Sequence, residues 1–135
     1  CAGIPYLPVD IVAAEDCTVM FLNGKTLLNT CDNGCKFHHT LVRNLLGIVA
    51  QNNMYLNQKI KYTSRKTTRE KLMTYLNDQA KMKGSNDFTI PFNRQELADY
   101  LGVERSAMSA ELGKLTKLGI LRTQRSHFTL LKPLD

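Results

Sequence analysis

The spacing of apolar residues predicts two β-strands at the start of the chain and helices after them. Residues 9–14 and 17–22 are short, mostly apolar runs of the length of a strand, with Glu15 and Asp16 suited to a tight connection between them. Two strands do not form a stable unit alone. We therefore expect that their pairing partners are missing and that the chain is a fragment of a longer protein.

From Phe37 onward the apolar period changes from two residues to about 3.6. Two neighbouring apolar stripes recur at spacings of three and four between residues 41 and 60, which predicts one long helix over residues 36–62. The chain offers little internal surface to cover both stripes, so we favour a dimer contact over a helix packed wholly within its own domain. The residues expected at that contact are Leu41, Leu45, Ile48, Val49 and Leu56.

A second helical region precedes a short strand. Residues 64–68 are polar and basic, and a new helix is expected to begin at Thr67 or Thr68 and to end before a loop at 83–87. Residues 88–92 then read as a short strand that Pro91 marks as an edge or an end.

The last third of the chain carries a helix-turn-helix pattern. Asn93 is a suitable N-cap, with Glu96 three residues later, for a helix over 94–101. A second helix is expected from about Glu104 to Leu118. The small Ala98 lets the two helices approach, and Gly102 tolerates the positive φ that the turn requires.

The start of the second helix has side chains that can hydrogen-bond to DNA bases. Arg105, Ser106 and Ser109 are of this kind, and the N-terminal end of such a helix enters the major groove. After Gly119, residues 120–123 and 127–131 read as a hairpin, or wing, in which Arg122 and Arg125 are available for phosphates.

Composition and charge agree with this interpretation. The 135 residues are 43% hydrophobic and 22% charged, which excludes collagen-like, low-complexity and strongly disordered chains. No apolar run reaches the roughly 18 residues of a membrane span, so we expect a soluble protein. The net charge is +6, and residues 63–135 hold thirteen basic against eight acidic side chains. Such an asymmetry is a hint of a half that binds a polyanion.

The cysteines and histidines do not form a complete metal pattern. Cys31, Cys35, His38 and His39 are soft ligands within nine residues, but no second, separated ligand pair follows. We therefore expect no metal site, and a reducing cytoplasm as the setting. Cys1 at the first position would suit a lipoprotein, but the mostly apolar residues after it argue against one.

Three segments together resemble the Crp/Fnr family of bacterial transcription regulators: Arg69–Leu72, Phe92–Ala98 and Val103–Ser109. The resemblance implies an α+β, mostly helical fold. Its parts would be a remnant of an effector-sensing, cyclic-nucleotide-binding-like β-roll at 1–35, a long dimerisation helix at 36–62 and a winged helix-turn-helix DNA-binding domain at 63–135. Most of the sensor would then be missing from this chain.

The resemblance also implies roles for individual residues. Bases would be read by Arg105, Ser106, Ser109 and Ala110, and the DNA backbone would be contacted by Asn93 and Arg94. The sequence departs from better-known members at Ser106, where an acidic residue is common, and at Ala110, where Arg is common. The familiar operator should therefore not be assumed.

The sequence does not identify the effector that the sensor would bind. Residues 6–10 lack the Arg-Ser/Thr pair by which family members hold a cyclic nucleotide, and the four cysteines do not match the iron–sulfur arrangement. The expected protein is a cytoplasmic homodimer on a palindromic DNA site, with RNA polymerase as a further partner that the resemblance implies. The alternative is a winged-helix protein-interaction module without DNA binding. An enzyme is not expected, because no nucleophile–base motif is recognisable.

Overall fold

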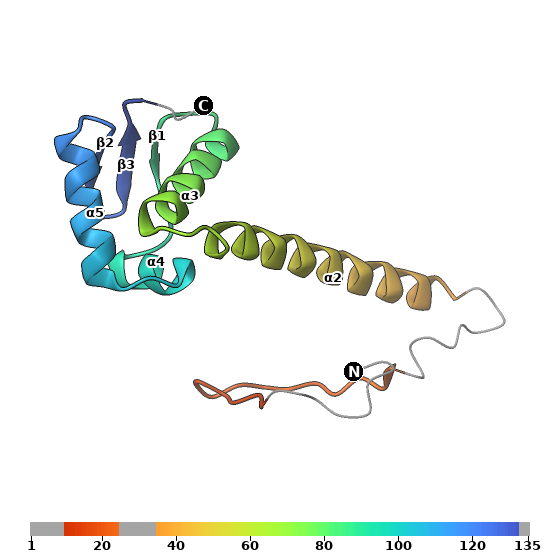
Figure 1. Cartoon of the computed structure of the whole chain (residues 1–135). Coiled ribbons are helices and arrows are strands. Elements are labelled where there is room, and N and C mark those ends of the chain that lie inside the picture. Colours follow the sequence, from red (N-terminus) through yellow and green to blue (C-terminus); the bar gives the residue numbers. More distant parts are fainter. Residues whose placement is uncertain (1–9, 25–34, 133–135) are drawn as a thin grey trace. The chain divides into compact units, whose positions relative to one another are not determined.

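The computed structural model describes residues 10–24 and 35–132, which form four helices and three strands (Figure 1). The chain divides into two units, residues 1–52 and residues 53–135. The predicted class, mostly helical with a small antiparallel sheet, is confirmed. None of the described helices is both long and apolar enough to cross a membrane.

The predicted long helix is present as α2 (Lys36–Thr63). Its last turn enters a hydrophobic core, where Tyr62 is only 1% exposed. Most of its apolar side chains remain in solvent: Leu46, Val49 and Ile60 are each more than 60% exposed. The helical period therefore creates an apolar face that the described residues of this chain leave largely uncovered.

Local signals in the sequence determine where α3 (Thr68–Lys83) begins and ends. Thr67 caps its first turn, because its hydroxyl accepts from the backbone N–H of Glu70 and the Glu70 carboxylate accepts from the N–H of Thr67. Gly84 ends the helix in the left-handed conformation. The predicted start at Thr67 or Thr68 is confirmed.

A three-stranded antiparallel sheet packs beside α3. It consists of β1 (Asp87–Thr89), β2 (Leu121–Gln124) and β3 (His127–Leu130), in the order β1-β3-β2. The strand predicted at 88–92 is shorter than expected and ends before Pro91. The sheet places β3 in the centre, with Phe88 of β1 opposite Phe128 of β3.

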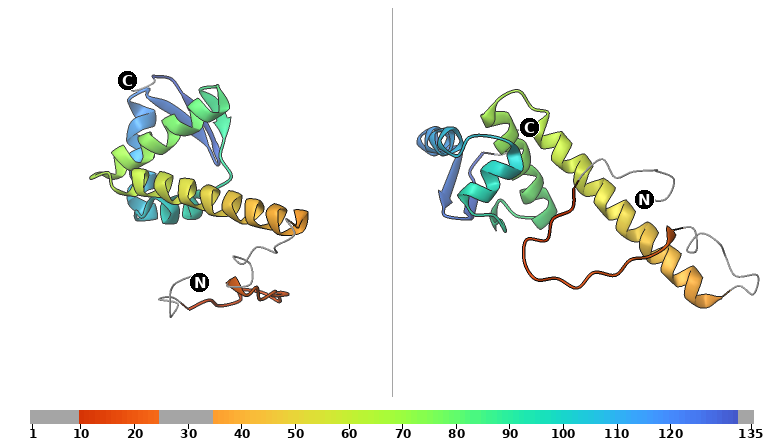
Figure 2. Two further views of the ribbon diagram at one scale, coloured as in Figure 1. Left: turned by 90° about the vertical axis from the view of Figure 1, so that its right-hand side faces the viewer. Right: turned by 90° about the horizontal axis from the view of Figure 1, so that it is seen from below.

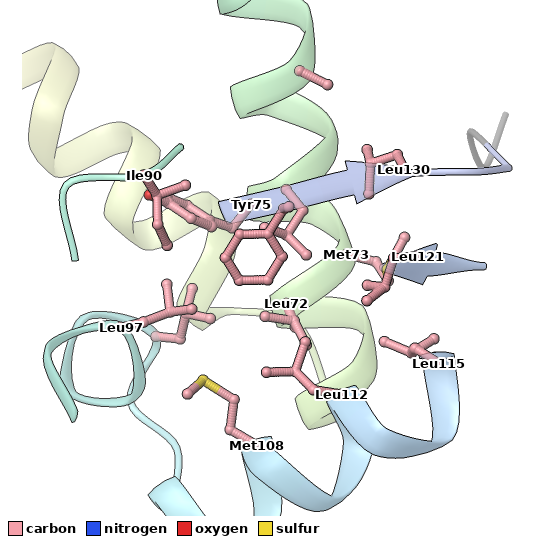
Figure 3. Close-up of a cluster of buried hydrophobic side chains, with 14 of the residues drawn as sticks. Leu72, Met73, Tyr75, Ile90, Leu97, Met108, Leu112, Leu115, Leu121 and Leu130 are labelled. Atoms are coloured by element: carbon pink, nitrogen blue, oxygen red, sulfur yellow. The ribbon is translucent and has the colours of Figure 1, made fainter. Parts of the chain in front are cut away.

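One hydrophobic core holds the C-terminal unit together. Helices α3, α4 (Arg94–Leu101) and α5 (Arg105–Lys117) gather against the sheet (Figures 1 and 2). Leu72 of α3, Leu97 of α4 and Met108 of α5 are 0% exposed and meet in the same cluster (Figure 3). Full burial of such side chains stabilises the fold by about 1.5–3 kcal/mol each.

The two strands predicted near the start of the chain are absent from residues 10–23. Ile11 and Val12 are both 83% exposed, and Phe21 is 94% exposed. A strand needs a neighbouring strand to hydrogen-bond with its backbone, and apolar composition does not replace that partner. Val9 lies outside the described residues, as do Cys1, residues 2–8 and residues 25–34. The assignment of residues 1–35 to a β-roll remnant stays a prediction.

Candidate nucleic-acid interface

The corner between α4 and α5 has the geometry that the sequence predicts for a helix-turn-helix. Asn93 caps α4: its Oδ1 accepts from the backbone N–H groups of Gln95 and Glu96 at 2.9 Å each, and the Glu96 carboxylate accepts from the Asn93 N–H at 2.7 Å. Gly102 ends α4 at φ 59°, a left-handed conformation. The predicted cap and the predicted positive φ are both confirmed.

Close packing fixes the two helices at this corner. Ala98 and Leu101 of α4 are 0% exposed, as is Met108 of α5. The Val103 N–H donates to the Ala98 carbonyl at 3.0 Å, and the Lys71 ammonium donates to the Gly102 carbonyl at 3.1 Å. Helix α3 thus supports the turn from outside the motif, a contact that the sequence did not reveal.

The predicted base-reading residues lie together on the exposed side of the first turns of α5. Arg105, Ser106, Ser109 and Ala110 are all exposed. Positions one, two, five and six of a helix fall on one face, since a turn takes 3.6 residues. The guanidinium of Arg105 and the two hydroxyls therefore share one accessible surface.

The one acidic residue of α5 is paired with basic side chains. This residue, Glu111, faces Arg69 of α3 at 3.7 Å and Lys114 at 3.3 Å. The Glu111 side chain is 14% exposed. Its negative charge is therefore largely balanced within the domain, whereas Arg105 and Lys117 stay exposed.

The wing follows α5 as predicted, but Gln124 belongs to its first strand, so the turn has two residues instead of three. Strands β2 and β3 pair from Leu121–Leu130 to Gln124–His127, and Arg125 and Ser126 form the turn. Arg125 has φ 53°, a left-handed conformation that is uncommon for a residue with a side chain. Arg122 and Arg125 are both exposed.

The wing turn is tied to the segment that leads into α4. The Ser126 hydroxyl donates to the Phe92 carbonyl at 2.9 Å, and the Ile90 N–H donates to the Ser126 carbonyl at 3.0 Å. Strand β1 and the segment Ile90–Phe92 that follows it therefore hold one side of the hairpin.

The Arg94 side chain is turned inward. Its Nη2 donates to the Thr123 hydroxyl of β2 at 2.6 Å, and its guanidinium carbon lies 5.0 Å from the centre of the Phe128 ring. Burial lowers the pKa of the Arg94 guanidinium below its ordinary value. Asn93, by contrast, is exposed at the start of α4.

The structure describes three of the four soft ligands named from the sequence, Cys35, His38 and His39. Residues 10–24 and 35–132 contain no cluster of three or more His, Cys, Asp or Glu side chains that could hold a metal ion. Cys35 and His38 fall at the start of α2, and Cys31 lies outside the described residues.

The comparison with protein families supports the helix-turn-helix geometry. Residues 70–134 match the family of Crp-like helix-turn-helix domains. Among solved structures, a transcriptional regulator of the Crp/Fnr family from Eubacterium rectale is similar at 16% sequence identity and a TM-score of 0.48. The similarity covers 75% of this chain and 44% of that one, so the chain spans less than half of that protein's length. No curated protein matches the sequence.

Proposed function

We propose, from the premise that residues 70–134 are a Crp-like helix-turn-helix domain, that this chain belongs to a sequence-specific DNA-binding transcription regulator of the Crp/Fnr type. The observation that carries the proposal is the exposed start of α5. There Arg105, Ser106 and Ser109 share one surface, and the acidic Glu111 nearby is already paired. Arginine and serine can donate to base edges in the major groove.

The DNA backbone would be contacted on both sides of that helix. Asn93 is exposed at the start of α4, and Arg122 and Arg125 are exposed on the wing. Contacts of this kind fix the position of a protein on the duplex but carry no sequence information. Sequence preference would then come from Arg105 and its neighbours on α5.

We propose that α2 makes the protein a homodimer through Leu41, Leu45, Ile48, Val49 and Leu56. Ile48, Val49 and Leu56 are 54%, 63% and 55% exposed, which leaves apolar surface for a partner helix. Leu41 and Leu45 are half-buried. A symmetric dimer presents two recognition helices, so its operator would be palindromic.

One polar residue supports a parallel, in-register dimer. Leu46, Val49, Asn53, Leu56 and Ile60 follow one another at spacings of three and four, the alternation of a coiled-coil seam. Val49 and Leu56 lie in this seam, whereas Leu41, Leu45 and Ile48 belong to the neighbouring apolar stripe. In the heptad notation of that seam, a to g, Asn53 occupies position a. A single Asn at this position specifies the register and a two-stranded coiled coil, at some loss of stability. Its Oδ1 already accepts from the Asn57 amide at 2.6 Å.

We also propose that an effector, bound by a sensor preceding α2, changes the spacing of the two recognition helices. An aromatic cluster supports transmission from the end of α2 to α4. The ring of Tyr100 in α4 lies 6.0 Å from Tyr55 and 6.1 Å from Tyr62 of α2, and 5.7 Å from Tyr75 of α3. The effector itself is unassigned, and the setting would be the cytoplasm. If the full-length protein bound its operator equally with and without every cell-derived ligand, the coupling would be wrong.

The decisive experiment is selection of bound sequences from a random DNA pool with the purified chain. We expect enrichment of a palindrome and an affinity that falls steeply with salt, because phosphate contacts release counterions. A protein-interaction module would enrich no sequence, and its binding to a partner protein would depend little on salt. That outcome would favour the alternative function.

A further inference from the structure

Arg94 has two conceivable roles, as a contact to a DNA phosphate or as an internal support for the wing. The residues around its side chain favour the second role. Its Nη2 donates to the Thr123 hydroxyl at 2.6 Å. Its Nη1 is buried and has no hydrogen-bond partner among the residues that the structure describes. A phosphate oxygen could not reach Nη1 without displacing the side chains that cover it.

The partners of Arg94 are on both strands of the wing. Thr123 of β2 and Phe128 of β3 are directly opposite each other in the sheet. The guanidinium carbon lies 5.0 Å from the centre of the Phe128 ring, within cation–π distance, and Phe128 is 0% exposed. The guanidinium of Arg94, at the start of α4, thus contacts the hairpin at two residues that pair with each other across the sheet.

We propose that Arg94 is a positioning residue that holds the wing at a fixed place relative to α4 and α5. A planar guanidinium can lie against an aromatic ring and donate to a hydroxyl at the same time, a geometry that a lysine ammonium does not reproduce. The Ser126–Phe92 and Ile90–Ser126 bonds fix the turn of the hairpin, and Arg94 fixes its strands. This inference rests on the proposed function, since it assigns a role in binding DNA through the wing.

Arg125 is the residue on which Arg94 would act. Arg125 lies in the wing turn, two residues after Thr123, and is exposed. If Arg94 sets the position of the wing, the contribution of Arg125 to DNA binding must depend on Arg94. If Arg94 instead contacted a phosphate directly, the losses of binding from changing Arg94 and from changing Arg125 would add without coupling.

The test uses Thr123→Val, which removes the accepting oxygen but keeps every charge and the β-branched shape. We expect operator binding to weaken about threefold to tenfold, which corresponds to the net contribution of one typical hydrogen bond. Arg125→Ala should weaken binding about tenfold in the wild-type chain and less than about twofold in the Thr123→Val chain. Arg94→Lys, which keeps the positive charge but not the planar guanidinium, should behave like Thr123→Val.

Thr129→Val is the matched control. Thr129 lies on β3 and its hydroxyl donates to Asp87 rather than accepting from Arg94. Arg125→Ala should therefore keep its full effect in that background. The proposal is overturned if Thr123→Val and Arg94→Lys both bind like the wild type and Arg125→Ala keeps its full effect in each.

Hydrogen exchange of the DNA-free protein separates this inference from the proposed function. Thr123→Val should speed exchange of the β2 and β3 backbone amides by about threefold or more, because the strands lose a tie to α4. Unchanged exchange would count against Arg94 as a support. If the wild type enriches no DNA sequence while exchange responds as expected, the support is correct and the DNA-binding function is wrong.

Discussion

The turn at Gly102 gives a prediction whose size can be worked out from the structure. Gly102 has φ 59°, and a Cβ built there would lie 4.0 Å from Cγ2 of Thr63, an ordinary van der Waals distance. Gly102→Ala therefore meets no steric clash with its neighbours. Its penalty comes from the left-handed backbone, about 1–2 kcal/mol for a residue with a side chain.

Part of that penalty is offset in the unfolded chain. Alanine has less conformational freedom there than glycine, which favours folding by about 0.4–1 kcal/mol. The net loss expected for Gly102→Ala is about 1 kcal/mol. In a folded unit of the size of residues 53–135, this lowers the Tm by about 4–8 °C.

Two other glycines serve as controls in the same thermal unfolding experiment, followed by circular dichroism. Gly84 has φ 64° with nothing within 4 Å of a built Cβ, so Gly84→Ala should lose a similar amount. Gly113 lies inside α5 with open space around it, so Gly113→Ala should gain about 0.5–1 kcal/mol. A Gly102→Ala protein that melts at or above the wild-type temperature would refute the reasoning.

Three further predictions concern the DNA contact, the dimer and pH. Arg105→Ala should lose roughly 1–3 kcal/mol of operator binding and relax preference at one base pair; an equal loss on random DNA would make Arg105 a phosphate contact. Asn53→Leu should yield a mixture of oligomers by light scattering where the wild type is a dimer, and an unchanged single dimer would contradict a role in register. Burial raises the pKa of Tyr75, so the folded state keeps a proton that the unfolded state releases above about pH 10. Stability is therefore full below that pH and falls above it; Tyr75→Phe should reduce the fall in Tm between about pH 9 and about pH 11, and an unreduced fall would assign it to other groups.

Predictions based on nearby residues were the most accurate. The caps of α3 and α4 depend on side chains three residues apart, and the structure has both. The hairpin predicted at 120–123 and 127–131 is also present, with its strands at Leu121–Gln124 and His127–Leu130. Such interactions depend on a few consecutive residues, so they can be predicted before the rest of the fold is known.

The N-terminal strands show where composition misleads. Residues 10–14 and 17–22 have the apolar content of strands, but a strand also needs another backbone to pair with. In the sheet, β1 pairs with β3, which lies about 40 residues later in the chain. No pattern within either segment identifies such a partner.

The sequence by itself determined the helices, the caps of α3 and α4, the sharp turn at Gly102 and the cluster of Arg105, Ser106 and Ser109. Each of these follows from contacts within one or two turns of the chain. Only the tertiary structure decided that Arg94 turns inward, because Thr123 and Phe128 come 29 and 34 residues after it. It also decided that Glu111 is balanced by Arg69 of another helix. A charged side chain takes the partner that folding brings closest, and the order of residues alone does not specify that partner.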